Sequence, residues 1–177
     1  LAVWGVARVP GLSGNAEGSV ITGPDGTPVG SSLIGVDPVP ANPAADPYFH
    51  TRPSASSEGP LGPADTSTSG GSNEGGYSTD LLEAVTQRRD LIAAREGVDP
   101  ALVPSDAVTA SASGLDPHIS PAYAALQMPR VARVTGLSED TVRGLLADAS
   151  DGRVLGFLGE PTVNVTELNL AVREAAR

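Results

Sequence analysis

Three side chains of the kind that hydrolases use lie close together in the chain. Ser113, Asp116 and His118 could serve as nucleophile, orienting carboxylate and general base in acyl transfer. A catalytic triad is assembled by the tertiary fold, however, so nearness along the chain is no evidence that the three side chains meet. One hypothesis is therefore a small secreted hydrolase that uses Ser113, Asp116 or His118. It requires the serine and the histidine to come within hydrogen-bonding reach.

The surrounding segment, residues 109–121, also reads as a purely structural connection. Small residues lead into a turn that Asp116 favours. Ser120 can then cap a helix whose first position is Pro121. On this interpretation His118 is a surface or packing residue, and the segment joins a strand, a turn and a helix.

A second candidate for chemistry is the glycine-rich segment 69–73. Glycine frees successive backbone amides, which could form an anion-binding nest shortly before a helix. The segment lacks the Gly-Lys-Ser/Thr ending of a phosphate-binding loop, and no obvious strand precedes it. A structural turn is the alternative. The weak nucleotide-binding candidates are Ser69, Gly70, Gly71, Ser72 and Asn73.

Composition argues against several other kinds of site. The chain has no cysteine, which rules out disulfides, thiolate metal sites and thiol catalysis. His50 and His118 are the only histidines and share no ligand spacing, so we expect no metal and no firmly bound cofactor. The formal net charge is -10, and the eleven basic residues are scattered arginines. Nucleic-acid binding is therefore disfavoured.

Length and composition indicate one domain that is rich in turns. A chain of 177 residues can bury a core of useful size. Glycine (21) and proline (16) are abundant, and because aromatic residues are few the core must depend on Leu, Val, Ile and Ala. We predict an α+β fold, a single compact domain of short strands and about four helices with long Pro/Gly-rich loops.

Short strands are expected in three places. Residues 18–22 and 29–35 flank a turn with Pro and Asp-Gly at 24–26, which predicts a hairpin. Residues 107–112, which have small side chains, and residues 153–157 read as further strands.

Four helical patterns are expected among the remaining residues. The first runs from a capping-box pattern at Asp80 to Gly97. The second begins after Ser120, runs to Gly136 and contains Pro129, which either kinks it or starts a second short helix. Ser138 and Asn164 are placed to cap the last two helices, each of which has an apolar stripe.

Two further stretches lack a regular pattern. Residues 36–76 contain seven prolines, and we expect no regular element there. Within them Tyr48 and Phe49 stand out as aromatic residues, and Arg52 follows at a distance that permits stacking or pairing. Residues 1–10 are apolar but about half as long as the roughly 20 residues that cross a bilayer. Read alone, they are an extended or frayed terminus.

Four sequence segments together resemble one protein family. They are YFHTRPSA at 48–55, SGGSN at 69–73, TASASGLDPHISP at 109–121 and GFLGEPTVNV at 156–165. In this order they are similar to the C subunit of the bacterial Kdp potassium-transporting P-type ATPase, the KdpC family. The resemblance spans most of the chain.

The resemblance implies a place in a membrane complex. Members of that family carry one N-terminal transmembrane helix, so residues 1–15 are expected to be the trailing end of this anchor and a linker. Residues 16–177 are then the soluble C-subunit domain, which we expect on the extracytoplasmic face of the cell membrane. The implied partners are the potassium-channel-like subunit and the ATP-hydrolysing subunit of the same pump.

The resemblance also implies a function. It indicates a non-catalytic accessory subunit that aids assembly and, in a chaperone-like way, raises the ATP affinity of the hydrolysing subunit. ATP would then be bound through that partner. The loop around residue 48 is expected to be ordered and to face a partner. The contact candidates are Tyr48, Phe49, His50, Arg52, Asp116, His118, Glu160, Asn164 and Asn169.

Overall fold

The computed structural model describes residues 1–23 and 25–177. Four of its α-helices, α3, α5, α6 and α7, have ten residues or more, and two small antiparallel sheets accompany them. The predicted α+β fold of short strands and about four helices is confirmed. In chain order the elements are α1 Ala2–Ala7, α2 Ser13–Ala16, β1 Val20–Thr22, β2 Pro28–Ser31, η1 Pro43–Ala45, α3 Thr79–Glu96, η2 Pro100–Leu102, α4 Ser105–Val108, β3 His118–Ile119, α5 Pro121–Thr135, α6 Glu139–Asp148, β4 Ser150–Asp151, β5 Thr162–Asn164 and α7 Val165–Ala175.

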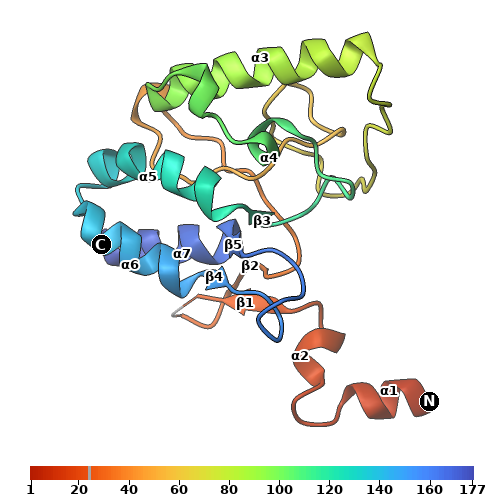
Figure 1. The fold of residues 1–177 in the computed structure, drawn as a ribbon. Coiled ribbons are helices and arrows are strands. Elements are labelled where there is room, and N and C mark those ends of the chain that lie inside the picture. The colour runs from red at the N-terminus through yellow and green to blue at the C-terminus, as the bar shows by residue number, and fades with distance from the viewer. Residues whose placement is uncertain (24) are drawn as a thin grey trace.

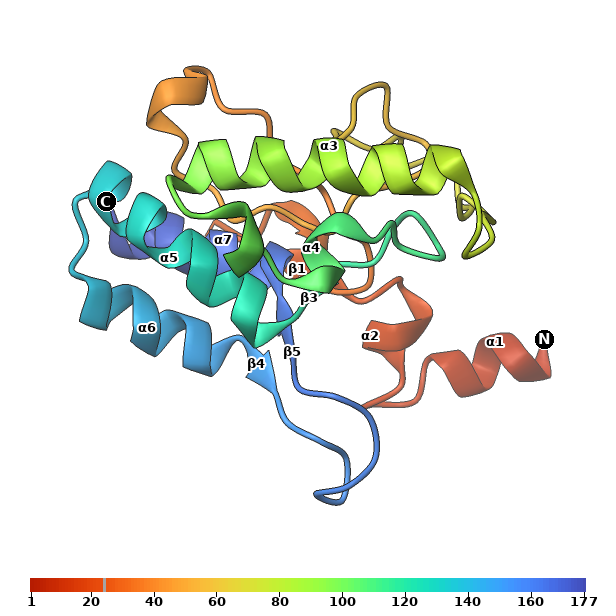
Figure 2. The ribbon, with the colours of Figure 1, turned by 45° about the horizontal axis from the view of Figure 1, so that its top comes forward.

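The helices are arranged on two sides of the core. Helix α3 lies along one side, and α5, α6 and α7 are grouped on the other (Figures 1 and 2). Two aromatic side chains, Phe49 and Tyr123, are fully or almost fully buried in the core. The largest aliphatic side chains of the core are Ile92, Ile119, Val131, Val142, Val163, Val165 and Leu168. Burial of these apolar surfaces provides the main driving force for the fold.

Side-chain caps begin the long helices. The side chains of Ser120, Ser138 and Asn164 each accept a hydrogen bond from an amide in the first turn, as predicted. The cap predicted at Asp80 is wrong, because Ser78 caps this helix: its hydroxyl accepts a hydrogen bond from the Leu81 amide at 3.2 Å. Asp80 lies in the first turn instead, where its charge complements the helix dipole.

Helix α5 continues through Pro129, so no new helix starts there. A proline removes the amide that would bond the carbonyl four residues earlier. Pro129 and Ala125 are both exposed, and water can therefore satisfy that carbonyl. The cost of an internal proline is smallest on such a face.

The two sheets are short and antiparallel. Strands β1 and β2 form the predicted hairpin, with Val20 opposite Ser31. Pro24, which the sequence places in its turn, lies outside the described residues. The other sheet has the order β3-β5-β4, with His118 opposite Asn164 in its β3-β5 pair. Strands far apart in the sequence therefore meet in this sheet.

The strand predicted at residues 107–112 is wrong. Ala107 and Val108 are buried, but they belong to α4, a single helical turn that packs beside α3. The Asp106 carboxylate accepts hydrogen bonds from the amide and hydroxyl of Ser120, both at 2.8 Å, and ties this turn to α5. Small apolar residues indicated burial correctly, but burial does not specify a strand.

The strand predicted at residues 153–157 is also wrong. Val154 and Leu158 exchange two backbone hydrogen bonds of 2.9 Å, so the segment is a tight hairpin that turns back on itself. Leu155 and Gly156 have φ values of 54° and 81°, which place both in the left-handed region. Glycine adopts this conformation readily, and it makes the turn possible.

Residues 36–76 are irregular as predicted, except for the one turn of η1, where the Asn42 side chain caps Pro43–Ala45. The apolar N-terminus, which read alone is an extended or frayed terminus, is helical from Ala2 to Ala7, and no residue of α1 is buried. Within the described residues, no helix is both long and apolar enough to cross a membrane. The assignment of residues 1–15 to an anchor stays a prediction.

Candidate functional site

The four recognised segments meet in the folded chain, with residues 109–121 at their centre. The Ser111 amide donates to the carbonyl of Pro53 at 2.8 Å, which joins the first and third segments. The Ser113 carbonyl accepts from the Gly70 amide at 2.8 Å, which joins the second and third. Separations of about 40 to 60 residues in sequence are thus closed by backbone bonds.

The fourth segment joins the same centre through the three-stranded sheet. The Val165 amide donates to the Pro117 carbonyl at 2.9 Å, beside the β3-β5 pair. Gly114 permits the close approach at the centre, since it has a φ of +72° and a Cβ there would lie 2.9 Å from the carbonyl oxygen of Gly70. We call this junction of the segments 48–55, 69–73, 109–121 and 156–165 the motif junction.

The hydrolase residues are only partly brought together. His118 Nδ1 lies 3.0 Å from Asp116 Oδ1, so the carboxylate and the imidazole do pair. The Ser113 hydroxyl instead bonds the Ser111 hydroxyl at 3.2 Å and accepts from the amide of Leu115. Among the described residues no hydrogen bond joins Ser113 to His118. The geometry gives no nucleophile-base pair in this structure.

The glycine-rich segment is used for packing. The Gly70 amide and the Ser69 hydroxyl both donate to the Ser113 carbonyl, so neither points to an open anion site. A cavity of about 490 Å³ adjoins Gly71, and the charged residues that line it are Glu74, Asp80 and Arg88. The guanidinium of Arg88 already donates to the carbonyls of Pro60 and Val108, and the two carboxylates oppose a phosphate group.

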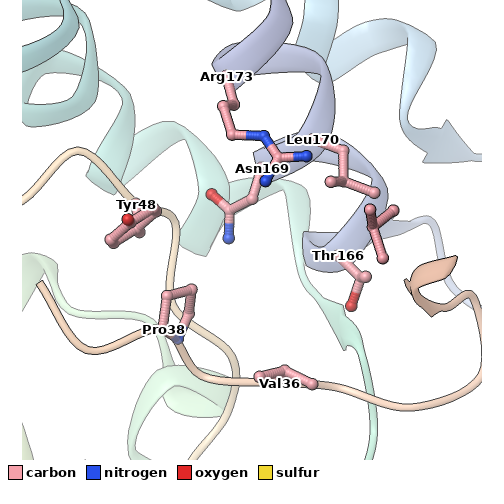
Figure 3. Close-up of a pocket in the computed structure, with 8 residues that line it drawn as sticks. Val36, Pro38, Tyr48, Thr166, Asn169, Leu170 and Arg173 are labelled. Carbon is pink, nitrogen blue, oxygen red and sulfur yellow. The ribbon is translucent and has the colours of Figure 1, made fainter. Parts of the chain in front are cut away.

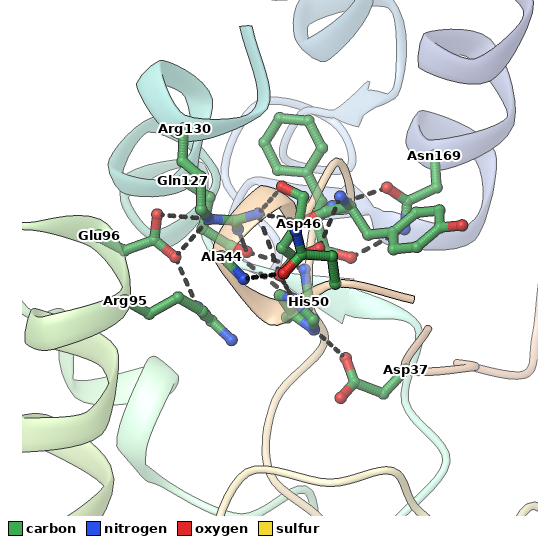
Figure 4. A network of polar contacts seen from close by, with 12 residues as sticks. Asp37, Ala44, Asp46, His50, Arg95, Glu96, Gln127, Arg130 and Asn169 are labelled. Carbon is green, nitrogen blue, oxygen red and sulfur yellow. Dashed lines mark hydrogen bonds and ion pairs between the residues drawn. The ribbon is translucent and has the colours of Figure 1, made fainter. Parts of the chain in front are cut away.

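Two amide side chains, one fully buried and one partly buried, hold the loop that carries Phe49 and His50. Gln127 accepts from the His50 amide at 2.8 Å and donates to its carbonyl at 3.2 Å. Asn169 accepts from the Phe49 amide and donates to its carbonyl, both at 2.8 Å. Each side chain therefore replaces the partner strand that this irregular segment lacks. We call the two the amide clamp; both appear in Figure 4.

The imidazole of His50 lies between two carboxylates. Its Nδ1 is 2.8 Å from Asp37 Oδ1, and its Nε2 is 2.6 Å from Asp46 Oδ2. Burial lowers the pKa of His50, but the hydrogen bonds to Asp37 and Asp46 outweigh burial and raise that pKa above its ordinary value. Burial raises the pKa of Asp46, but its contacts with His50, with the Tyr48 amide and with Arg130 together outweigh burial and lower that pKa below its ordinary value. The charged imidazolium, with two donors, fits both contacts.

An ion network extends from this histidine to α3 and α5 (Figure 4). Arg130 lies 3.2 Å from Asp46 and 3.0 Å from Glu96, and it donates to the carbonyls of Asp46 and Tyr48 at 2.7 and 2.9 Å. Arg95 pairs with the other oxygen of Glu96 at 2.7 Å. Among the described residues every buried side-chain nitrogen and oxygen has a partner. The network thus ties the loop to two helices without an unpaired charge.

The hairpin at residues 153–160, which we call the exposed hairpin, behaves differently. Val154, Leu155, Phe157 and Leu158 are 65%, 80%, 68% and 50% exposed. The ion pair between Arg153 and Glu160 closes its base at 2.7 Å. Figure 2 shows this connection between β4 and β5 projecting from the body of the molecule. It is a hydrogen-bonded turn with an apolar surface, and its residues 156–160 belong to the fourth recognised segment.

The predicted contact residues are distributed between interior and surface. Phe49, His50 and Asn164 are buried, and their contacts lie within this chain. Tyr48, Arg52, Asp116, His118 and Asn169 are partly buried, and Glu160 is exposed. Arg52 links the motif junction by donating to the carbonyls of Thr109 and Ala110. Contact of these residues with a partner stays a prediction.

Sequence reasoning missed Gln127, Arg130 and the acidic partners of His50. A signal was present, because Gln127 and Arg130 fall on the same face of α5 as Tyr123 and are buried with it. Polar residues on a buried helical stripe require partners. The sequence could not show that the partners are backbone groups more than 70 residues away.

Comparison with known proteins agrees with these motifs. The model of the family KdpC, described as "K+-transporting ATPase, c chain", matches residues 1–174. The "Potassium-transporting ATPase KdpC subunit" of Kineococcus radiotolerans is 51% identical over 176 residues, which cover 99% of this chain and 84% of that protein. The KdpC subunits of Polaromonas naphthalenivorans and Sorangium cellulosum are each 50% identical; the matches cover 97% and 89% of this chain and 83% and 78% of those proteins. The chain therefore belongs to the KdpC family, the c chain of K+-transporting ATPases.

Proposed function

We propose that this chain is a non-catalytic accessory subunit of an ATP-driven, high-affinity potassium pump. It aids assembly by binding the potassium-channel-like and the ATP-hydrolysing subunits. Family membership supports the role in potassium transport. The observation that carries the binding role is the exposed hairpin, whose four large apolar side chains pack against little of their own chain.

The exposed hairpin suits a protein contact for two reasons. Fully burying one large apolar side chain is worth about 1.5–3 kcal/mol. Because each of the four is between half and four fifths exposed, covering them all offers on the order of 4–8 kcal/mol before the costs of association. The hairpin is also already ordered by its own backbone bonds and by the Arg153–Glu160 pair. Little conformational entropy is therefore lost when a partner covers it.

The non-catalytic part of the proposal follows from the polar groups. The Ser113 hydroxyl is engaged by Ser111 and the amide of Leu115, and the imidazole of His118 pairs with Asp116. The alternative, a small secreted hydrolase, would need Ser113 and His118 to be joined. The arrangement of the described residues favours the accessory subunit.

We infer that ATP is bound by the hydrolysing subunit and that this chain raises its ATP affinity in a chaperone-like way. The Gly70 amide is already bonded to the Ser113 carbonyl, which argues against a nucleotide site at residues 69–73. With a single-pass anchor and residues 16–177 on the extracytoplasmic face of the cell membrane, the domain is separated from the nucleotide. Its influence then acts through the conformational equilibrium of the partner, as a coupling free energy.

The experiment replaces Phe157 with serine in the anchored subunit, co-expressed with the other pump subunits. The amount of this subunit that stays with the pump through detergent purification is measured, together with the KM for ATP of the potassium-stimulated ATPase. Leu102→Ser is the matched control, because Leu102 is 64% exposed but lies in η2, outside the recognised segments. We expect Phe157→Ser to lower the affinity of this subunit for the other pump subunits about 10-fold, and Leu102→Ser to leave that affinity unchanged.

Two results would contradict the proposal. Retention of the Phe157→Ser subunit at the wild-type level would show that the exposed hairpin is not part of the interface. Recovery of a fully assembled, potassium-stimulated ATPase without this subunit would show that assembly does not require it. Thermal unfolding of the variant must match that of the wild type, which we expect because the side chain is mostly exposed.

A further inference from the structure

Two adjoining cavities lie against the outer face of α7. Their volumes are about 200 and 370 Å³, and they share Tyr48, Asn169 and Arg173. Val36 and Leu170 add apolar walls to the first. We call the pair the Tyr48 groove. Figure 3 shows the first cavity, with Leu170 and Arg173 projecting from α7 and Tyr48 on the facing loop.

The polar groups of the groove are unequally engaged. The Asn169 amide is occupied by the backbone of Phe49, and the Thr166 hydroxyl donates to the Ile34 carbonyl. Among the described residues the guanidinium of Arg173 and the hydroxyl of Tyr48 have no hydrogen bond or ion pair. A guanidinium can only donate. The free chemistry of the groove therefore calls for a ligand that supplies acceptors.

The charge of the groove is opposite to that of the chain. The protein has 21 acidic and 11 basic residues, yet among the described residues no Asp or Glu lines either cavity. Arg177 joins Arg173 along the second cavity. Asp25 lies with these two arginines in a neighbouring cavity, but its carboxylate already accepts from the amide and hydroxyl of Thr27. The groove is a basic position on an acidic protein.

The shape of the groove favours an extended chain. Thr166, Leu170 and Arg173 lie at helical spacing on one face of α7, so their part of the lining extends about 10 Å along the helix, and Arg177 follows just beyond its C-terminal end. An extended segment of about three residues has this length. Tyr48 belongs to one of the four recognised segments, which makes the groove continuous with the loop of the motif junction.

We propose that the Tyr48 groove binds an extended segment of a partner subunit in which a carboxylate side chain stands beside an apolar one. The carboxylate pairs with Arg173, and the apolar side chain lies against Val36, Pro38 and the ring of Tyr48. Since the inference rests on the proposed function, it deepens that function by naming the chemistry of one contact. The pairing is charge-assisted, which makes it stronger than a hydrogen bond between neutral groups.

The test compares Arg173→Glu with Arg133→Glu in the anchored subunit. Both arginines are exposed, both stand in the last turn of an α-helix, and neither has an ion pair among the described residues, so the two changes have the same effect on net charge and on a helix dipole. Affinity for the remaining pump subunits is measured at low and high salt. We expect Arg173→Glu to weaken binding about 10-fold or more and Arg133→Glu to leave it within about 2-fold.

The outcomes separate this inference from the proposed function. If the wild-type subunit is not retained at all, the proposed function fails. If it is retained and Arg173→Glu binds equally well, the Tyr48 groove is not part of the interface and the inference is overturned. A supporting result is a salt dependence of binding that the wild type shows and Arg173→Glu loses.

A second arm tests a small ligand as the occupant. Hexanoate has a carboxylate on an apolar chain, and hexanol lacks the charge. Amide shifts of the 177-residue chain are followed during titration with each. Saturation of the Tyr48 groove by micromolar hexanoate would overturn the peptide occupant in favour of a small carboxylate. Hexanoate binding that is millimolar or weaker would agree with the peptide occupant, because hexanoate then reproduces only one contact of a longer segment.

Discussion

Replacement of Gln127 by leucine tests the amide clamp. The Gln127 side chain is fully buried, accepts from the His50 amide and donates to the His50 carbonyl. It also accepts from Arg130 at 3.3 Å. Leucine has a similar size and fills the space, so the change removes the hydrogen bonds without leaving a large cavity.

The magnitude follows from the groups that lose their partners. A buried donor or acceptor without a partner costs about 1–3 kcal/mol, and two backbone groups of His50 are affected, which gives about 2–6 kcal/mol. The greater hydrophobicity of leucine offsets a small part of this. We expect Gln127→Leu to lower the free energy of unfolding by about 2–5 kcal/mol. For a domain of this size the melting temperature then falls by roughly 5–15 °C.

Urea unfolding followed by far-ultraviolet circular dichroism measures the change. Gln87→Leu on the exposed face of α3 is the control, and we expect it to stay within about 0.5 kcal/mol of the wild type. A loss below about 1 kcal/mol for Gln127→Leu would refute the reasoning, since it would mean that the loop does not depend on this side chain for its backbone bonds.

Two more predictions concern pH and close packing. Burial lowers the pKa of His50, but hydrogen bonds to Asp37 and Asp46 outweigh it, so the folded-state pKa lies above 6.5. The stabilisation from His50 is then complete below about pH 6.5 and is lost as the pH rises through the folded-state pKa. The urea midpoint of the wild type should therefore fall as the pH rises through that pKa, and the midpoint of His50→Asn should change less. A wild-type midpoint that rises over this pH range would contradict the prediction. Gly114→Ala should lower the free energy of unfolding, measured by thermal unfolding, by about 1–3 kcal/mol because the φ of Gly114 is +72°. The control is Gly144→Ala, which should be neutral or stabilising because a Cβ at Gly144 meets no atom within 4 Å.

The long helices and their beginnings could be read from the sequence because capping is local. In Ser120, Ser138 and Asn164 the capping oxygen meets an amide three residues later, whatever the rest of the chain does. The β1-β2 hairpin is also local, because its two strands follow each other in the chain. Asp80 failed as a cap because Ser78, two residues earlier, offers the same chemistry.

The two wrong strands show where local patterns end. Ala107 and Val108 are apolar and buried, but whether a helical turn or a strand buries them depends on α3, against which α4 packs. Val154 and Phe157 have strand-forming side chains, yet among the described residues this segment pairs only with its own return, through the bridge from Val154 to Leu158. Pairing partners are supplied by the tertiary structure.

The candidate sites divide in the same way. Composition and the four recognised segments determined the family, the α+β class and the absence of thiol chemistry, because these depend only on which residues are present and in what order. The meeting of the four segments, the amide clamp on Phe49 and His50, and the Tyr48 groove were decided by the tertiary structure. Each joins groups tens of residues apart, and a buried polar group obtains its partner only when the whole core closes around it.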